Sequence, residues 1–376
     1  MIEVRPGPLS NQGGALMLQA IVQELGDAYE LVVEPWIGPY PARARLGLRQ
    51  LLWIRSLGPA AGLPARLLPR TLRMRYGIVD RREVDVVLDA SGYAFGDPFD
   101  VARVRRLSQD LLRAAHRGNK IVLLPQAFGP FEREPVRDAS RAAIDAAELV
   151  YARDPASRDA VLELGAARGR VRLAPDFTGA LAGIPPPEEG WGRRVAIVPN
   201  ERMIGSGAAD EQVYHRFLRT CAGAVRDAGY EPVLVVHEGA RDRAFLGRGG
   251  HASFDPTLPQ VVEADPLRLK GLLGATHAVV SGRYHALASA LAQGVPVLAT
   301  GWSHKYRALL DEYGVADALL DPTSHPDAVR GCVAELVDPG TRPARSAALV
   351  AAAGRRQTAV EAMWREVRTL IASGPG

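Results

Sequence analysis

The 376-residue chain contains little cysteine, little lysine and few aromatic residues. Its two cysteines, Cys221 and Cys332, cannot form a disulfide framework or a cysteine-based metal site. Only three of the 46 basic residues are lysines, namely Lys120, Lys270 and Lys305. A lysine is therefore unusual here, and its position deserves interpretation.

Long apolar runs are absent as well. No stretch of about 18 consecutive apolar residues occurs, so we expect no membrane-spanning helix. The first residues lack the basic and apolar regions of a signal peptide. Together with 47% hydrophobic and 23% charged residues, these absences predict a globular cytoplasmic protein.

One segment, residues 43–82, is strongly basic. It carries ten arginines and one acid, a net +9, so the rest of the chain must carry −5 to give the overall +4. Apolar runs interrupt these arginines, which predicts contact with anionic lipid headgroups or with a lipid-linked acceptor. A solvated arginine-rich insertion is the alternative. No nucleic-acid-binding module is recognisable, so nucleic acid is not an expected partner.

Apolar β-branched runs alternate with helical patterns along most of the chain, which predicts βαβ units and parallel sheets. We expect an α/β protein with two Rossmann-like domains that face each other across a cleft. The predicted boundaries are an N-terminal domain at 1–183, a Pro/Gly-rich linker at 184–194, a C-terminal domain at 195–340, and a helix at 341–376 that packs back on the first domain.

The segment Ser281–His285 interrupts two apolar runs with polar residues. Gly282 permits a tight exit from the predicted strand, and the following helix start favours an anion. Arg283 adds a planar fork for phosphate or carboxylate, and His285 can exchange a proton near neutral pH. These types at this spacing predict an anion site, although a salt-bridged arginine and a structural histidine would give the same letters.

Lys305 follows the next predicted strand, 295–300. In a parallel sheet this turn lies beside the previous one, so Lys305 is expected to face the same anion. His237, Glu238 and Asp242 are too loosely spaced to predict a metal site, and we expect none.

The segment "SGRYHALASALAQGVPVLATGWSHKYRALLDEYG" resembles the signature of the polysaccharide pyruvyl transferases. Weaker matches precede it in the family's order: "NQGGALMLQAIVQEL", "LDASGYAFGD", "LLPQAFGPF", "YARDPASRDAVLELG" and "APDFTGAL". Together they cover most of residues 1–315. The order of the motifs, more than any single one, supports the resemblance.

The resemblance implies a GT-B-like fold and the transfer of pyruvate from phosphoenolpyruvate to two sugar hydroxyls, which forms a ketal. It implies no cofactor, and a glycan or lipid-linked sugar as acceptor. The donor site would lie mainly in the second domain, with Ser281 and Gly282 in its turn. By position, the donor-site residues are Arg283, His285 and Lys305, and Arg153 reaches the site from the first domain. Protonation of the donor carbon is assigned to His285.

The acceptor side is less defined. Asn11, Gly13 and Gln126 fall in family-like turns of the first domain. Asp89 and Asp176 end predicted strands and could hold hydroxyls, although a capping role is commoner for such aspartates. The turn at Asn11 lacks the aspartate usual in the family, and Ser91-Gly92 replaces paired glycines, so the acceptor stays open.

Two other functions fit the same architecture. A nucleotide-sugar-dependent glycosyltransferase or epimerase also binds phosphates at a helix start, but the helix after Arg283 lacks the acidic residue those enzymes use for a sugar or ribose. A non-catalytic glycan- or lipid-phosphate-binding protein is the second alternative.

Overall fold

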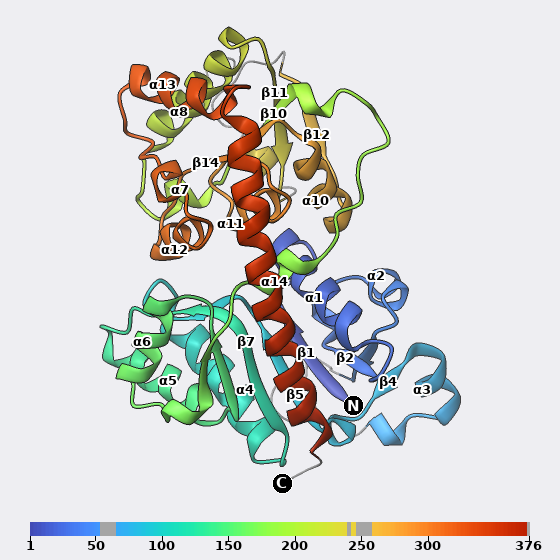
Figure 1. Ribbon diagram of the computed structural model, residues 1–376. Helices are drawn as coiled ribbons and strands as arrows, with labels where there is room; N and C mark the ends of the chain where they lie inside the picture. The colour runs from blue at the N-terminus through green and yellow to red at the C-terminus, as the bar shows by residue number, and fades with distance from the viewer. Residues whose placement is uncertain (53–64, 239–241, 246–257, 374–376) are drawn as a thin grey trace. The chain divides into compact units, whose positions relative to one another are not determined.

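The computed structural model describes residues 1–52, 65–238, 242–245 and 258–373 (Figure 1). The chain forms two compact units. Unit 1 comprises Met1–Ser10, Gly14–Phe177 and Ala359–Gly376, and unit 2 comprises Asn11–Gly13 and Thr178–Thr358. The short turn at Asn11–Gly13 thus groups with unit 2, although sequence analysis assigned it to the first domain.

Unit 1 contains a parallel sheet of order β4-β3-β2-β1-β5-β7-β8-β9, with β6 paired to β7. The strands are β1 (Ile2–Pro6), β2 (Leu31–Val33), β3 (Arg49–Leu51), β4 (Ile78–Val79), β5 (Val86–Ala90), β6 (Tyr93–Phe95), β7 (Lys120–Phe128), β8 (Leu149–Ala152) and β9 (Val171–Leu173). Its helices include α1 (Gln12–Leu25), α2 (Tyr40–Arg45), α3 (Arg70–Tyr76), α4 (Val101–Ala115), α5 (Glu134–Asp145) and α6 (Pro155–Glu163).

Strand order reverses at β1 in this sheet, because β2 to β4 extend to one side of β1 and β5 to β9 extend to the other. In open α/β sheets, ligands bind outside the carboxyl ends of the strands at such a switch point. The carboxyl end of β5 carries Asp89, which pairs in register with Arg5 of β1. This edge is the place in unit 1 where a site is expected.

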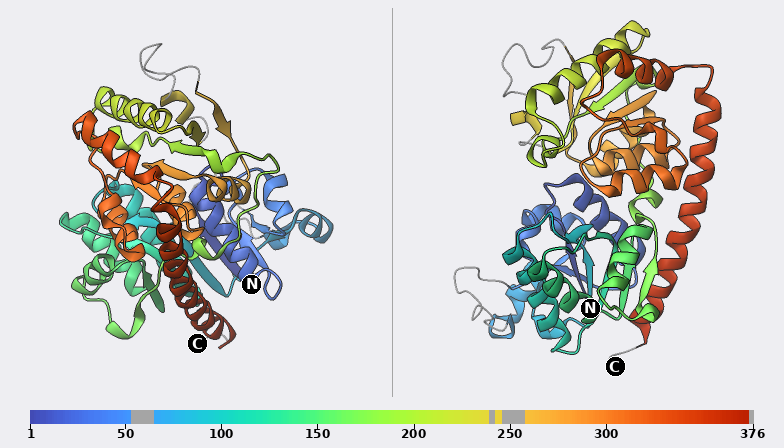
Figure 2. Two further views of the ribbon diagram at one scale, coloured as in Figure 1. Left: turned by 45° about the horizontal axis from the view of Figure 1, so that its top comes forward. Right: turned by 90° about the vertical axis from the view of Figure 1, so that its left-hand side faces the viewer.

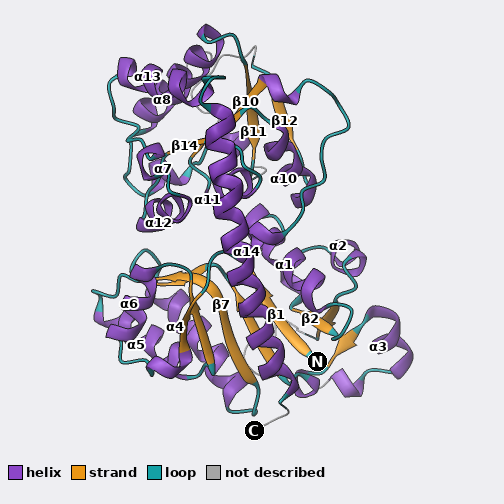
Figure 3. Ribbon diagram, in the orientation of Figure 1, coloured by secondary structure: helices purple, strands orange, loops and turns teal. Residues whose placement is uncertain are grey.

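Unit 2 contains a five-stranded parallel sheet of order β12-β11-β10-β13-β14 (Figure 3). The strands are β10 (Arg194–Val198), β11 (Glu231–Val236), β12 (Gln260–Val262), β13 (Ala278–Ser281) and β14 (Val297–Ala299). The helices are α7 (Arg202–Gly205), α8 (Glu211–Asp227), α10 (Pro266–Ala275), α11 (Tyr284–Ala292), α12 (His304–Tyr313) and α13 (Pro326–Val337). Here the order reverses between β10 and β13.

Both faces of the unit 2 sheet are buried, as Figure 2 shows by the helices on either side. Val195 and Ile197 of β10 pack in the layer that contains α8 and α13. Ala196 and Val198 alternate to the other layer, with α10, α11 and α12. Because successive residues of each strand pack in opposite layers, the whole strand is apolar. Such continuous apolar runs are easy to recognise in the sequence.

Helix α14 (Arg342–Ala372) belongs to both units, since residues up to Thr358 group with unit 2 and those from Ala359 with unit 1. In unit 1 its Trp364 is buried against Phe177, with ring centroids 5.5 Å apart. Glu366 accepts a hydrogen bond from the Tyr151 hydroxyl at 2.7 Å. The last turns of the chain therefore complete the core of unit 1.

None of the helices in the described part of the chain has the length and apolar character needed to cross a membrane.

Candidate functional site

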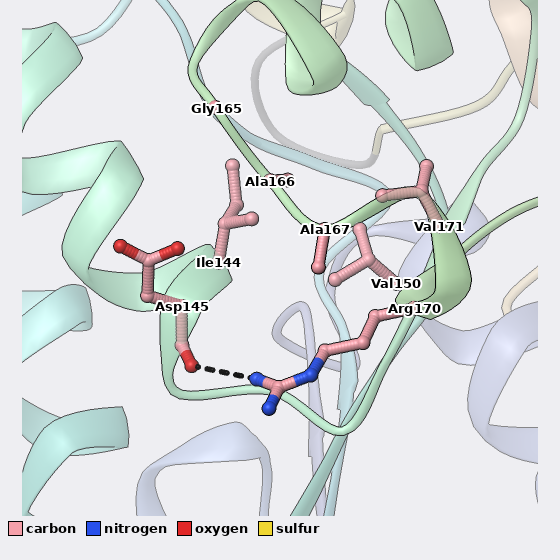
Figure 4. A pocket seen from close by; sticks show the side chains of 8 residues that line it. All are labelled: Ile144, Asp145, Val150, Gly165, Ala166, Ala167, Arg170 and Val171. Carbon is pink, nitrogen blue, oxygen red and sulfur yellow. Dashed lines mark hydrogen bonds between the residues drawn. The ribbon is translucent and has the colours of Figure 1, made fainter.

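A hollow of about 300 Å³ lies in unit 1 between α5, β8 and β9 (Figure 4). Arg170 at its rim donates a hydrogen bond to the carbonyl of Asp145 at 3.3 Å. Val150 and Val171, which also line it, stand at the amino ends of their strands. Because ligands of such sheets bind at the carboxyl ends, this hollow is not the candidate site.

The candidate site in unit 2 is built on the turn between β13 and α11. The carbonyl of Gly282 accepts a hydrogen bond from the Tyr306 hydroxyl at 2.9 Å and one from the side-chain amide of Asn200. The Ser281 hydroxyl accepts a hydrogen bond from the backbone N–H of Arg283 at 2.8 Å. Asn200 follows β10 and so ties the two sides of the switch point together.

Gly282 is required by space rather than by backbone conformation. Its φ is not in the left-handed region. A Cβ at this position would lie 3.0 Å from Thr300 Oγ1 and from the Tyr214 hydroxyl, and 3.1 Å from Asn200 Cβ. Glycine is therefore favoured at position 282 because three side chains pack closely against the turn.

Arg283 is buried and its charge is balanced by two carboxylates. Its Nη1 lies 2.7 Å from Glu238 Oε2, and Nη2 contacts Asp242. Nε donates to the carbonyl of Pro199 at 3.3 Å. Burial opposes the charge of Arg283, but the two carboxylates outweigh it and raise the pKa of the guanidinium. Arg283 thus stays charged and binds both Glu238 and Asp242, which follow β11.

The turn Asn11–Gly13 completes this part of the site. Asn11 Nδ2 donates to Glu238 Oε1 at 2.7 Å, so Glu238 receives both Asn11 and Arg283. A Cβ on Gly13 would overlap the ring of His285. The residues that sequence analysis placed on the acceptor side therefore lie against the predicted donor residues.

Two histidines occupy different environments beside Arg283. His285 is partly exposed and packs edge-to-face on Tyr284, with ring centroids 5.3 Å apart. His237 is buried, and burial together with the charges of Arg283 and His285 holds its pKa well below its ordinary value. Within the described residues, His237 Nδ1 has no hydrogen-bond partner.

Lys305 lies among three aromatic rings. Its Nζ is 4.6 Å from the ring centroid of Trp302, 5.5 Å from Tyr306 and 5.6 Å from Tyr284. These rings attract the ammonium group and hold the long side chain in place. Lys305 therefore starts α12 as an oriented cation.

Arg202 was not predicted from the sequence. It follows β10 at the switch point, and its guanidinium carbon lies 5.7 Å from the Trp302 centroid, so both cations contact one indole. Arg202 is exposed, and no carboxylate in the described part of the chain pairs with it. Arg202 and Lys305 thus present two cations at this edge, whereas Glu238 and Asp242 balance the charge of Arg283. Such an edge can bind an anion.

The switch point of unit 1 carries a carboxylate instead. Asp89 Oδ1 accepts hydrogen bonds from the Ser91 hydroxyl at 2.6 Å, the Ser91 N–H at 3.2 Å and Gln126 Nε2 at 3.2 Å. No residue in the described ranges donates to Oδ2. Burial raises the pKa of Asp89 despite these donors and the nearby charge of Arg5. Asp89 is thus fixed by one oxygen, while the other can accept a hydroxyl.

The remaining two predicted residues form a buried ion pair in unit 1. Arg153 Nη1 lies 3.2 Å from Asp176 Oδ2, with side-chain exposures of 3% and 1%. Asp176 is therefore engaged by Arg153, whereas Asp89 has no cation bonded to it. This difference separates two aspartates that the sequence could not rank.

The sequence signals for the unpredicted residues are weak. Arg202 follows "VPNE" at the end of β10, and only the strand order shows that this turn lies next to Gly282. In the sequence, Glu238 and Asp242 resemble only a poor metal motif. Their pairing with Arg283 depends on β11 and β13 flanking β10 on opposite sides.

The chain has the fold of solved GT-B structures. The chain is similar to HepE from Anabaena in complex with UDP and glucose, with a TM-score of 0.59, 13% identity, and 99% of each chain covered. It is similar to S. aureus MnaA bound to UDP, with a TM-score of 0.58, 13% identity, and 98% and 96% covered. The chain is also similar to the spinosyn forosaminyltransferase SpnP, with a TM-score of 0.55, 14% identity, and 99% of each chain covered. The predicted fold class is confirmed.

The sequence pattern of the polysaccharide pyruvyl transferases matches residues 11–304. The chain belongs to the polysaccharide pyruvyl transferase family, as its motifs indicated. No curated protein matches it.

Proposed function

We propose that the protein transfers pyruvate from phosphoenolpyruvate to two hydroxyls of a sugar, which forms a pyruvate ketal and releases phosphate. The observation that carries this proposal is the pair of cations at the switch point of unit 2, with Arg202 and Lys305 on Trp302, and with His285 linked to Lys305 through the ring of Tyr284. Phosphoenolpyruvate bears a phosphate and a carboxylate, and its binding needs more than one cation. Family membership supports pyruvyl transfer over other anion chemistry.

The reaction balances without a cofactor, and phosphoenolpyruvate is a substrate. A proton adds to the terminal methylene carbon, which becomes a methyl group and leaves an oxocarbenium-like centre. One sugar hydroxyl attacks that centre and loses its proton. The carbon–oxygen bond to phosphate breaks with its electron pair, phosphate takes up a proton, and the second hydroxyl closes the ring as it loses its own.

His285 is the proposed general acid, since it is partly exposed and packs on Tyr284, the ring that also contacts Lys305. A group of this kind typically contributes about 10²–10⁴ in rate. Lys305 and Arg202 are proposed to neutralise the donor's anionic groups and the departing phosphate. Arg153, whose charge Asp176 balances inside unit 1, is not proposed as one of these cations. Arg283 is proposed to position this site, because its charge is balanced by Glu238 and Asp242.

Asp89 is proposed to accept a hydrogen bond from an acceptor hydroxyl through Oδ2. The acceptor is proposed to be a glycan or lipid-linked sugar of exopolysaccharide or cell-wall biosynthesis. The same proposal places the protein in the cytoplasm, at the inner face of the plasma membrane.

The test is phosphate release from phosphoenolpyruvate, with and without a panel of glycosides and lipid-linked sugars, followed by mass spectrometry of the acceptor. We expect release that depends on the acceptor, and a product that gains a ketal-linked pyruvate. A parallel reaction contains UDP-glucose and UDP-N-acetylglucosamine. Turnover of these donors, without acceptor-dependent phosphate release, would contradict the proposal.

A further inference from the structure

One edge of unit 1 exposes an unusual concentration of apolar side chains. Ten large hydrophobic residues of the described chain are exposed, and six of them fall between residues 36 and 76. The six are Trp36, Tyr40, Leu67, Leu72, Met74 and Tyr76. Helices normally bury an apolar face, but α3 buries no residue, and its Met74 is 72% exposed. Figure 1 shows α3 at the edge of the sheet beyond β4.

Two of these side chains join α2 to α3. The rings of Tyr40 on α2 and Tyr76 on α3 meet edge-to-face with centroids 5.9 Å apart. The Tyr40 hydroxyl also donates to the carbonyl of Arg75 at 3.4 Å. Leu72 and Met74 lie on different sides of α3, so this helix exposes apolar side chains on more than one side.

The structure also shows which arginines of the basic segment are available. Arg43 is buried, and Arg49, Arg73 and Arg81 each pair with a glutamate. Arg55 lies outside the described residues and the side chain of Arg66 is not described. The exposed arginines without a carboxylate partner in the described part of this segment are Arg45, Arg70, Arg75 and Arg82.

We propose that these six apolar residues and four arginines form a docking surface for a bilayer that contains anionic lipid. Four unpaired cations complement the negative headgroups, and each contributes about fivefold to binding, the factor that corresponds to about 1 kcal/mol. Leucine and methionine side chains enter the acyl boundary, while tryptophan and tyrosine suit the interface. A nucleic acid or an acidic protein would use the arginines but would leave Leu67 and Met74 in water.

All of these residues belong to unit 1, so the proposed surface does not depend on which reaction the protein catalyses. It deepens the proposed function in one respect, since a membrane-docked transferase meets a lipid-linked acceptor directly. Only that step rests on the proposed function.

The test is flotation of the full-length protein with vesicles of phosphatidylcholine, alone or with 30% phosphatidylglycerol as a chosen, roughly cytoplasmic-leaflet-like charge density. We expect binding to the anionic vesicles that weakens as salt rises, and little binding to neutral ones. Arg70→Glu with Arg75→Glu should weaken binding at least tenfold, and so should Leu72→Asp with Met74→Asp. Acceptor-dependent phosphate release with a water-soluble glycoside should be unchanged in both variants.

Matched controls carry the same chemical changes elsewhere. Arg105→Glu with Arg106→Glu alters two exposed arginines of α4, and Val350→Asp alters an exposed apolar residue of α14. Both controls should bind as the wild type does. Absence of wild-type binding at low salt, or equal losses in the controls, would overturn the proposal. Loss in the arginine variant alone, with the Leu72/Met74 variant unaffected, would also overturn it and would favour a polyanionic macromolecule.

Discussion

The two sheets have the same kind of switch point but opposite chemistry at it. In unit 2 the carboxyl ends of β10, β13 and β14 carry Arg202, Arg283 and Lys305. In unit 1 the corresponding place at β5 carries Asp89, held by neutral donors from Ser91 and Gln126. A cationic edge suits an anion, and a carboxylate with one open oxygen suits a hydroxyl. The proposed donor role of unit 2 rests on the cations, and the proposed hydroxyl-binding role of unit 1 rests on Asp89.

The largest expected effect tests the cationic side. His285→Gln should lower acceptor-dependent phosphate release by about 10²–10⁴, because the general acid is lost. Binding of phosphoenolpyruvate, measured by calorimetry, should change far less. His116→Gln on the exposed end of α4 is the control, and equal activity of the two variants would remove His285 from the mechanism.

The next effect is on stability. Arg283→Ala should destabilise unit 2 by about 3–5 kcal/mol, because it leaves two largely buried carboxylates without a cation. Urea unfolding followed by tryptophan fluorescence measures the loss. Adding Glu238→Gln to this variant should restore part of the stability. If the double variant is less stable than the single one, the interpretation of Arg283 as a clamp is wrong.

A change at Asp89 should affect the use of the acceptor and leave donor binding unchanged. Asp89→Asn should lower kcat/KM for the acceptor by about 10–100-fold, equivalent to about 1.5–3 kcal/mol for a hydrogen bond to a charged group. The affinity for phosphoenolpyruvate should not change. Asp176→Asn is the comparison, since it strips Arg153 of its partner and should lower the free energy of unfolding instead. A loss of donor affinity in Asp89→Asn would contradict the division of roles.

Acid should weaken unit 2 through His237. Its folded pKa lies below the unfolded value of about 6.5, so the unfolded state binds the extra proton first. The stability is fully present above pH 6.5 and falls by about 1.4 kcal/mol per unit below it. His237→Asn should flatten this slope in urea unfolding at pH 7.5, 6.5 and 5.5. The exposed His116→Asn should keep it, and an unchanged slope in His237→Asn would refute the assignment.

The smallest effect concerns Arg202. Arg202→Ala should weaken phosphoenolpyruvate binding by about 3–10-fold, the scale of an exposed cation. Arg202→Lys should recover part of the affinity. Arg193→Ala, an exposed arginine before β10, should have no effect. Equal affinities of Arg202→Ala and wild type would leave Lys305 as the proposed donor cation.

The sequence predicted unit 2 better than unit 1, and the reason is visible in their central strands. β10 reads as an uninterrupted apolar run because both of its faces are buried. β1 does not look like a strand of the core in the sequence, since "IEVRP" contains Glu3 and Arg5, whose side chains pair at 2.8 Å inside the protein. A charge pair that is satisfied only after folding looks like a surface segment in the sequence.

The candidate site shows the same limit. Gly282, Arg283 and His285 were recognisable because one turn holds them together. The carboxylates that neutralise Arg283 come from more than 40 residues earlier in the chain, after β11. Of the three rings around Lys305, Trp302 and Tyr306 are near it in the sequence, and Tyr284 comes from α11. Local motifs identify the residues, but their charge balance is a property of the sheet order.

Helix α14 has a consequence for the order in which the protein can be made. Trp364 fills the core of unit 1 against Phe177, and Glu366 binds Tyr151, yet both residues follow the whole of unit 2 in the chain. The N-terminal unit therefore stays incomplete during synthesis of the whole of unit 2. A chain that stops before Ala359 would contain all of unit 2 but would lack the Trp364 side chain that fills the core of unit 1. The residues from Ala359 onward are therefore needed to complete the fold of the part that is synthesised first.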